Sequence, residues 1–211
     1  MIIIINPNST VSMTQAMLET AHKACPDIMI KGWTSHKGPV AIQGPEDGEA
    51  CVPHLLKLVE KASDDGASAI IIGCFDDTGL DAARNLAVCP VIGIGQAAYH
   101  LAALAGARFS VVTTLCVSIP ILVANVDNYG LGRNLAKVRA SGVPVLALET
   151  DVEASARRVL QEILLAQDED DIQSVVLGCA GMSHIPAIAG PEIKVRLIDG
   201  VRAAVQLGAL L

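Results

Sequence analysis

The segment IIIGCFDD, residues 70–77, is nearly repeated by the segment VVLGCAGM, residues 175–182. In both segments an aliphatic run of strand length ends in Gly-Cys. Continuous aliphatic runs of this length favour parallel strands that are buried on both faces. The two segments therefore predict two similar α/β units, each with a cysteine, Cys74 or Cys179, at the end of a buried strand.

The spacing between these cysteines, 105 residues, recurs elsewhere in the chain. It superposes VIGIG, which ends at Gly95, on RLIDG, which ends at Gly200. It also brings Asn8-Ser9 onto Thr113-Thr114, each pair just after a hydrophobic run. Ligands of open α/β sheets bind beyond the carboxyl ends of the strands. We therefore infer an internal repeat, and we expect the two cysteines to face one another across a cleft.

Short apolar runs alternate with longer segments of helical period along the whole chain. This alternation predicts the α/β class, with two lobes that are related by a pseudo-twofold axis, each a four-stranded parallel sheet flanked by helices. The lobes are expected at residues 1–96 and 97–211, with the option that a C-terminal helix, residues 200–211, packs back on the first lobe. Strands are predicted at Ile2–Ile5, Ile28–Trp33, Ala69–Gly73, Pro90–Ile94, Phe109–Thr113, Val143–Leu148, Ser174–Gly178 and Val195–Ile198. Helices are predicted after NPNST, residues 6–10, and near residues 49–63, 79–87, 96–105, 117–128, 151–167 and 200–210.

The composition limits the partners of the chain. Its 211 residues suffice for a sizeable core, and with 52 % hydrophobic but only 2 % aromatic residues this core must be aliphatic. A net charge of -7 without a basic cluster argues against nucleic acid and anionic membranes as partners. The first ten residues lack the basic start of a signal peptide, and no apolar run reaches the length of a membrane span. We therefore expect a cytoplasmic protein with reduced cysteines.

Residues 93–98, GIGQAA, fit the glycine pattern of a dinucleotide-binding turn. The acidic residue that such a site needs further along is missing, because no Asp or Glu occurs between Asp81 and Asp127. We interpret the glycines as a tight turn between a strand and a helix. Without a P-loop, a CxxC pair or clustered metal ligands, the sequence predicts no cofactor and no metal.

Two facing thiols suit the transfer of a proton between the two faces of one carbon atom. One cysteine, as thiolate, removes the proton, and the other, as thiol, delivers one from the opposite side. An unperturbed thiol has a pKa of about 8.5, so both protonation states are accessible near neutral pH. We predict that Cys74 and Cys179 form this acid/base pair, and we interpret the other four cysteines as small hydrophobic residues.

Asp76 and Asp77 follow Cys74, and His184 lies five residues after Cys179. A carboxylate raises the pKa of a neighbouring thiol and an imidazolium lowers it, so these groups could decide which thiol is ionised at rest. Asp199 ends the last predicted strand and is expected to support the site from behind. Helix capping is the alternative interpretation of Asp76 and Asp77, and an ordinary loop position is the alternative for His184.

The motifs INPNST, GCFDD, FSVVTT and GCAGM, in this order and spacing, resemble those of the hydantoin racemases. These enzymes belong to the cofactor-independent aspartate/glutamate/hydantoin racemase superfamily, and the resemblance covers nearly the whole chain. It implies two Rossmann-like lobes with the active site between them, Cys74 and Cys179 as the acid/base thiols, no cofactor, and a homo-oligomer. It also implies that residues after the cysteines, and after the first strand of each lobe, hold the oxygen atoms of the substrate. These residues are Asn8, Phe75, Thr113, Thr114, Ala180 and Gly181.

Amino-acid racemases of this superfamily tend to carry a small hydroxyl residue after each cysteine, whereas this chain has Phe75 and Ala180. The departure favours a neutral ring, and we expect racemisation of 5-monosubstituted hydantoins at C5. Allantoin racemisation, aspartate or glutamate racemisation and decarboxylation at an activated carbon are alternatives within the superfamily. A small-molecule binding protein or a redox sensor on the same fold is the alternative that is not a racemase.

Overall fold

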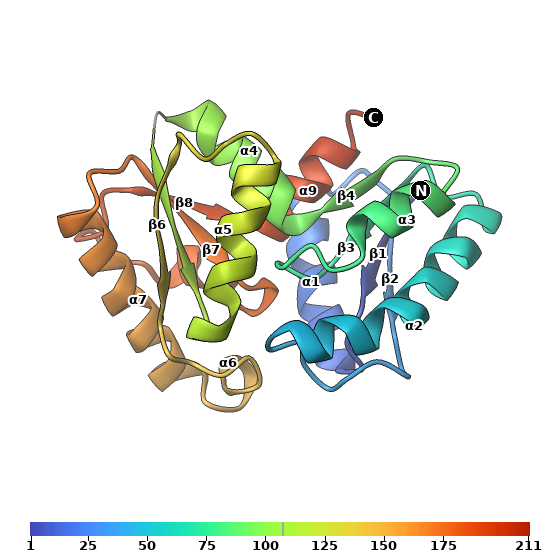
Figure 1. Cartoon of the computed structure of the whole chain (residues 1–211), viewed down its shortest axis with the longest axis horizontal. Helices are drawn as coiled ribbons and strands as arrows, with labels where there is room; N and C mark the ends of the chain where they lie inside the picture. The colour runs from blue at the N-terminus through green and yellow to red at the C-terminus, as the bar shows by residue number, and fades with distance from the viewer. Residues whose placement is uncertain (107) are drawn as a thin grey trace.

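The computed structural model describes residues 1–106 and 108–211, which form two α/β lobes side by side (Figure 1). Each lobe contains a four-stranded parallel sheet, which confirms the predicted fold class. The strand order is β2-β1-β3-β4 in the first sheet and β6-β5-β7-β8 in the second. The strands are β1 (Ile2–Asn6), β2 (Ile30–Thr34), β3 (Ala69–Ile72), β4 (Val91–Gly93), β5 (Phe109–Thr113), β6 (Leu135–Ala140), β7 (Ser174–Gly178) and β8 (Arg196–Asp199).

Helices cover both faces of each sheet, so the central strands are buried on both sides. The outer faces are covered by α2 (Pro45–Asp64) and α3 (Leu80–Leu86) in the first lobe and by α7 (Val152–Glu169) in the second. Four helices lie between the sheets: α1 (Val11–Ala24), α4 (Ile94–Ala105), α5 (Ile119–Asn128) and α9 (Gly200–Gly208). The short elements are η1 (Cys116–Ser118), α6 (Ala147–Thr150), η2 (Ala180–Met182) and α8 (Ile185–Ile188).

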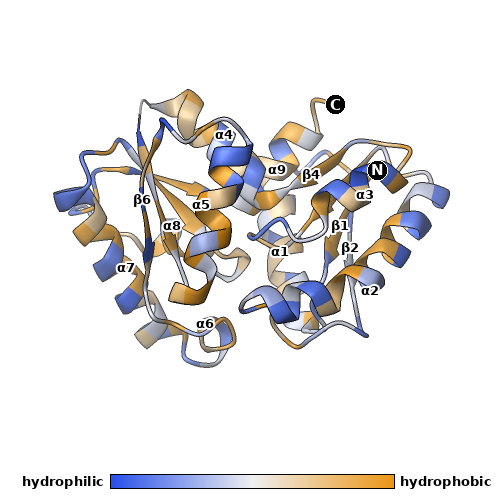
Figure 2. Cartoon of the chain, viewed as in Figure 1, coloured by the Kyte–Doolittle hydropathy of each residue, from blue (hydrophilic) through white to orange (hydrophobic). Residues whose placement is uncertain are grey.

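Along β1 the isoleucines alternate between two cores. Ile3 and Ile5 belong to the outer core under α2, while Ile2 and Ile4 belong to the inner core, as expected for a strand whose side chains alternate between faces. The inner core also contains Val176 of the second sheet, so the two lobes share one hydrophobic core. Figure 2 shows the hydrophobic strands inside each lobe and hydrophilic residues on the outer surface of α7. None of the helices in the described part of the chain combines the length and the apolar composition that a membrane crossing requires.

The helices α4 and α9 join the lobes (Figure 1). α4 follows β4 of the first sheet but packs against β7 and β8 of the second. α9 follows β8 of the second sheet but packs against β3 of the first, where Gly208 lies against the side chains of Ile2, Ile92 and Ala69. The two helices also pack against each other. A boundary at residue 96 remains a prediction, because each of these helices contacts both sheets.

The prediction of the sixth strand at Val143–Leu148 is wrong. Residues 143–146 form a loop, α6 begins at Ala147, and the strand at this edge of the second sheet is Leu135–Ala140. The apolar run VPVLAL is buried as a loop, whereas the true strand carries Lys137 and Arg139. The repeat spacing of 105 residues does predict the true strand, because adding 105 to the bounds of β2 gives residues 135–139, which lie in β6.

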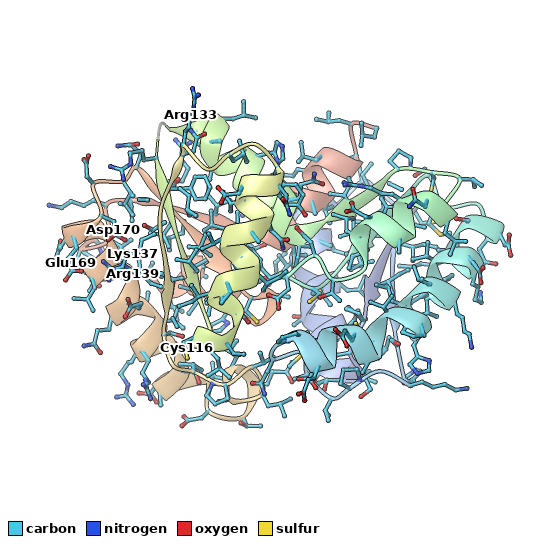
Figure 3. All side chains as sticks on the ribbon, viewed as in Figure 1. Cys116, Arg133, Lys137, Arg139, Glu169 and Asp170 are labelled. Atoms are coloured by element: carbon cyan, nitrogen blue, oxygen red, sulfur yellow. The ribbon has the colours of Figure 1, made fainter. Side chains whose placement is uncertain are left out.

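Arg139 explains how a charged residue fits into this strand. Its guanidinium forms ion pairs with Glu162, Glu169 and Asp170, the last at 2.5 Å, and Ser110 also donates a hydrogen bond to Asp170. Figure 3 shows Arg139, Glu169 and Asp170 together at the outer edge of the second lobe. Buried charges require partners, and here the partners come from the C-terminal end of α7.

The sheet register also changes one detail of the repeat. Ile2 pairs with Ala69 in the first sheet, and Phe109 pairs with Ser174 in the second. Because Ala69 and Ser174 are 105 residues apart but Ile2 and Phe109 are 107 apart, Thr113 corresponds to Asn6. The predicted match of Asn8 to Thr113 is therefore wrong by two residues.

Candidate active site

Cys74 and Cys179 line the same cavity, which lies between the two lobes. Cys74 follows the end of β3 by two residues, and Cys179 follows β7 directly. The cavity has a volume of about 50 Å³, enough for a few water molecules or one small ring. Its lining consists of Asn6, Asn8, Met13, Met17, Ile42, Gly73, Cys74, Phe75, Asp76, Thr113, Thr114, Ser118, Val145, Gly178, Cys179, Ala180 and Gly181.

Contacts between the lobes border the cavity. Ile42 belongs to the loop before α2, and the next residue, Gln43, accepts a hydrogen bond from the N–H of Val145 at 2.9 Å. Met13, Ala41 and Val145 form a small buried cluster that packs against Cys179. The long glycine- and proline-containing segment at residues 36–48 therefore contributes to the mouth of the cavity.

The two cysteines have similar backbone surroundings, although only Cys74 also has a side-chain partner, the hydroxyl of Thr78 at 3.7 Å. The N–H of Asp76 hydrogen bonds to the sulfur of Cys74, and the N–H of Gly181 hydrogen bonds to the sulfur of Cys179. The N–H groups directly after the cysteines, those of Phe75 and Ala180, find no acceptor among the described residues. Each lobe therefore presents one amide to its thiol and one free amide beside the cavity.

Burial raises the pKa of both thiols. The pKa of Cys74 lies well above its usual value, and that of Cys179 rises to about 12. The negative charge of Asp76 raises both values further, while the N–H groups on the sulfurs lower them in part. The expectation of thiol pKa values near neutral pH is thus wrong for this structure, because burial disfavours the charged thiolate.

Asp76 is the predicted neighbour that reaches the cavity. Its side chain is partly buried, and desolvation raises its pKa to about 6. The carboxylate makes no hydrogen bond or ion pair with any residue that the structure describes. Its charge acts on Cys74 of the same lobe and on Cys179 of the other.

Asp77 lies outside the cavity and holds the Cys74 loop against α4. Its carboxylate accepts hydrogen bonds from the N–H groups of Gly95 and Gln96, at 3.0 and 2.7 Å, and from the hydroxyl of Tyr129 at 2.9 Å. A Cβ atom on Gly93 or Gly95 would collide with Asp77 or with the Phe75 carbonyl. The glycines of GIGQAA therefore allow the close approach of the Cys74 loop to this helix.

His184 and Asp199 also lie outside the cavity. Both line a neighbouring cavity that shares Ala180 and Gly181 with the first. The Nδ1 atom of His184 lies 3.1 Å from the Gly181 carbonyl, and Asp199 accepts a hydrogen bond from the N–H of Arg202 at the start of α9. His184 is not among the groups that shift the pKa of Cys179. The expected influence of this imidazole on the thiol pKa is therefore not seen.

The six residues expected to bind substrate all line the cavity, but their side chains differ in availability. Asn8 is engaged, since its Oδ1 accepts hydrogen bonds from Asn6 and from the Thr10 N–H. Thr113 donates to the Gly178 carbonyl. The ring of Phe75 packs edge-on against Tyr99 in the core, so this residue offers its backbone.

The hydroxyls of Thr114 and Ser118 remain available, because neither has a partner among the described side chains and backbone groups. Ser118 was not predicted, although it ends the segment TTLCVS that continues from β5. Its position in a 3₁₀ turn at the start of α5 brings it to the cavity, and no local pattern indicates that turn. Within residues 1–106 and 108–211, no three His, Cys, Asp or Glu side chains come together as a metal site.

Comparison with known proteins defines the class. The family model described as Asp/Glu/Hydantoin racemase matches residues 2–208. A hydantoin racemase of Rhizobium meliloti is 43% identical over 99% of this chain and 87% of its own length. Allantoin racemases from Klebsiella pneumoniae and Pseudomonas fluorescens have solved structures with TM-scores of 0.95 and 0.94, at 34% and 31% identity. Each match extends over 100% of this chain. It covers 86% of the Klebsiella pneumoniae chain and 89% of the Pseudomonas fluorescens chain.

The chain belongs to the Asp/Glu/hydantoin racemase family. It is a racemase, that is, an isomerase, as the resemblance of its motifs implied.

Proposed function

We propose that the protein interconverts D- and L-5-monosubstituted hydantoins by a two-base proton transfer at C5, without a cofactor. The observation that supports this most directly is the pair Cys74 and Cys179, which end equivalent strands and line one cavity. The names of the similar curated proteins point to the same substrate class.

The reaction has two steps. One cysteine thiolate removes the C5 proton, and the electron pair of the C–H bond passes into the ring as an enolate on the C4 oxygen. The other thiol then protonates C5 from the opposite face, so that a thiol and a thiolate have exchanged places. The free N–H groups of Phe75 and Ala180, with the hydroxyls of Thr114 and Ser118, supply donors for the ring oxygens.

The lining favours a neutral ring over an amino acid. None of the lining side chains is Lys, Arg or His, so a substrate carboxylate would find no counter-ion in the cavity. Met13, Met17, Ile42 and Val145 make much of the wall apolar. The C5 proton of a hydantoin is also more acidic than the α-proton of a zwitterionic amino acid, so a thiolate suffices as base.

Allantoin is the second candidate. It is itself a hydantoin with a ureido group at C5, and the solved allantoin racemases resemble this chain over its full length. The same cavity and the same two thiols would serve it.

Polarimetry with a panel of single enantiomers tests the proposal. The panel contains 5-benzylhydantoin, 5-isobutylhydantoin, allantoin and L-aspartate, with a chelator in every assay. We expect loss of rotation with one or both alkyl hydantoins and none with aspartate. Racemisation of allantoin alone would select the second candidate. Racemisation of aspartate alone, or activity abolished by the chelator and restored by a divalent ion, would overturn the proposal.

From the family resemblance we also propose a homo-oligomer that works in the cytoplasm. Light scattering on the purified protein tests the first part, since a mass of 21.9 kDa would mean a monomer.

A further inference from the structure

Asp76 is an unpaired, partly buried carboxylate that lines the cavity between the lobes. It lies two residues after Cys74, in the turn that leads from β3 to α3. The backbone at this point is held from the other lobe, because the Asn125 side chain donates a hydrogen bond to the Asp76 carbonyl at 2.8 Å. The carboxylate itself has no partner among the described residues. Since a partly buried charge without a hydrogen bond is costly, its retention requires an explanation.

The other polar side chains and free amides of the cavity offer hydrogen-bond donors but no unoccupied side-chain carboxylate or amide acceptor for a substrate N–H group. Phe75 and Ala180 offer backbone donors, and Thr114 and Ser118 offer hydroxyls. The side-chain oxygens of Asn6 and Asn8 already accept hydrogen bonds within the protein. A hydantoin, however, carries an N–H group, N1–H, directly beside C5. The Asp76 carboxylate is the charged acceptor of this cavity that no protein group occupies.

We propose that Asp76 accepts a hydrogen bond from the ring N–H next to the reacting carbon, and thereby selects cyclic ureides over rings without that N–H. The inference rests on the proposed hydantoin racemisation and specifies which residue recognises the ring. Hydrogen bonds to an ionised acceptor are stronger than neutral ones, and a site built to bind a substrate N–H discriminates against an analogue that lacks it.

The position of Asp76 relative to the thiols agrees with this role. Asp76 lines the same cavity as Cys74 and Cys179, and its charge acts on both thiols. C5 must lie between the same two sulfurs for proton transfer, and N1 is bonded to C5. With a pKa of about 6, Asp76 is mostly ionised at pH 8, where it serves as an acceptor.

A pair of substrates isolates the proposed hydrogen bond. The first is 5-benzylhydantoin, and the second is 5-benzyl-oxazolidine-2,4-dione, in which a ring oxygen replaces N1–H. The ratio of their kcat/KM values is measured for the wild type, Asp76→Ala and the isosteric Asp76→Asn at one pH. Both substrates meet the same thiols, so any change in thiol ionisation cancels in the ratio. Their different intrinsic acidities cancel when the ratios of two enzymes are compared.

We expect the preference for the hydantoin to fall by about 10- to 100-fold in Asp76→Ala relative to the wild type. Asp76→Asn should show a smaller loss, because an amide oxygen still accepts a hydrogen bond without the charge. The matched control is Glu149→Gln. Glu149 also raises the pKa of Cys179, but it does not line the cavity, so this variant should keep the wild-type ratio.

Two results would overturn the inference. If the ratio in both Asp76 variants equals that of a wild type that racemises hydantoins, Asp76 does not recognise the ring, while the proposed function stands. If the wild type racemises neither compound, the proposed function and the role of Asp76 fall together.

Discussion

The side chain of Gln43, in the first lobe, accepts a hydrogen bond of 2.9 Å from the backbone N–H of Val145, in the second lobe. Val145 lines the cavity that contains Cys74 and Cys179, and Gln43 follows Ile42, which lines it from the other side. A further link lies nearby, where Ser12 of α1 donates to Glu149 of α6 at 2.7 Å. These contacts join the two lobes beside the cavity.

Removal of the Gln43 contact should weaken the junction of the lobes beside the cavity. In Gln43→Ala the Val145 N–H loses its partner, at a cost of about 1–2 kcal/mol to this arrangement of the lobes. We expect kcat/KM for a hydantoin to fall by about 5- to 30-fold. Steady-state kinetics check this, with Gln15→Ala, an exposed glutamine on α1, as the control. Equal losses in both variants would show that the Gln43 contact has no particular role.

The two thiols should have separable roles. Cys74→Ser and Cys179→Ser should each reduce racemisation by at least about 100-fold, because a hydroxyl is a far weaker acid than a thiol. Each variant should still exchange the C5 proton of one enantiomer for deuterium without inversion, and the two variants should act on opposite enantiomers. Proton NMR of each enantiomer in deuterated water, corrected for spontaneous exchange, measures this.

Cys116→Ser is the matched control for the thiol variants, since Cys116 is exposed and does not line the cavity. It should racemise at the wild-type rate. If either Cys74→Ser or Cys179→Ser also did so, the surviving cysteine would not be half of an acid/base pair.

The rate should depend on pH through the buried thiols. Burial raises the pKa of Cys179 to about 12 and that of Cys74 well above its usual value, and the proposed mechanism needs one of them as thiolate. On this mechanism, only a small fraction of the enzyme carries a thiolate near neutral pH. We expect kcat/KM to rise by up to about tenfold per pH unit between about pH 7 and 9, after subtraction of spontaneous racemisation. A plateau that begins below about pH 7 would contradict this.

Asp77 should matter for stability rather than for chemistry. It joins the Cys74 loop to α4 and Tyr129 through three hydrogen bonds, and an amide at this place accepts them less well. Asp77→Asn should therefore lower the free energy of unfolding by about 1–3 kcal/mol at pH 5, where the stabilising contribution of this carboxyl group is present. Urea denaturation measures it, with Asp81→Asn as the control, because the Asp81 side chain is 96% exposed. An equal effect of both substitutions would rule out the proposed role of the three hydrogen bonds.

The same carboxylate should make stability pH-dependent. Burial raises the pKa of Asp77 to about 7, above its ordinary value of 3.8, so between these values the folded state binds more protons than the unfolded state. The contribution of Asp77 to the free energy of unfolding is fully present at low pH and is lost as pH rises toward 7. Asp76, with a pKa of about 6, makes stability depend on pH in the same direction. In Asp77→Asn the fall in unfolding free energy between pH 4 and 7 should become shallower. An unchanged slope would mean that Asp77 does not titrate in this window.

The ends of the buried strands and the internal repeat could be predicted from the sequence, because both depend on local patterns. An aliphatic run followed by Gly-Cys indicates a buried strand and a turn wherever it occurs, and parallel strands share an edge. The sixth strand could not be recognised in the same way. Its Arg139 is buried only because Glu162, Glu169 and Asp170 come to it from another element, so its local pattern resembles a surface segment.

By itself, the sequence determined that two cysteines would end equivalent strands of a repeated α/β unit, and hence that they could share one site. Only the tertiary structure decided that α4 and α9 cross between the lobes, that Asp77 caps a helix 18 residues further on, and that Gln43 contacts Val145 of the opposite lobe. It also decided the ionisation of the site. The pKa of a thiol depends on how much water and which charges surround it, and residues from both lobes control that at Cys74 and Cys179.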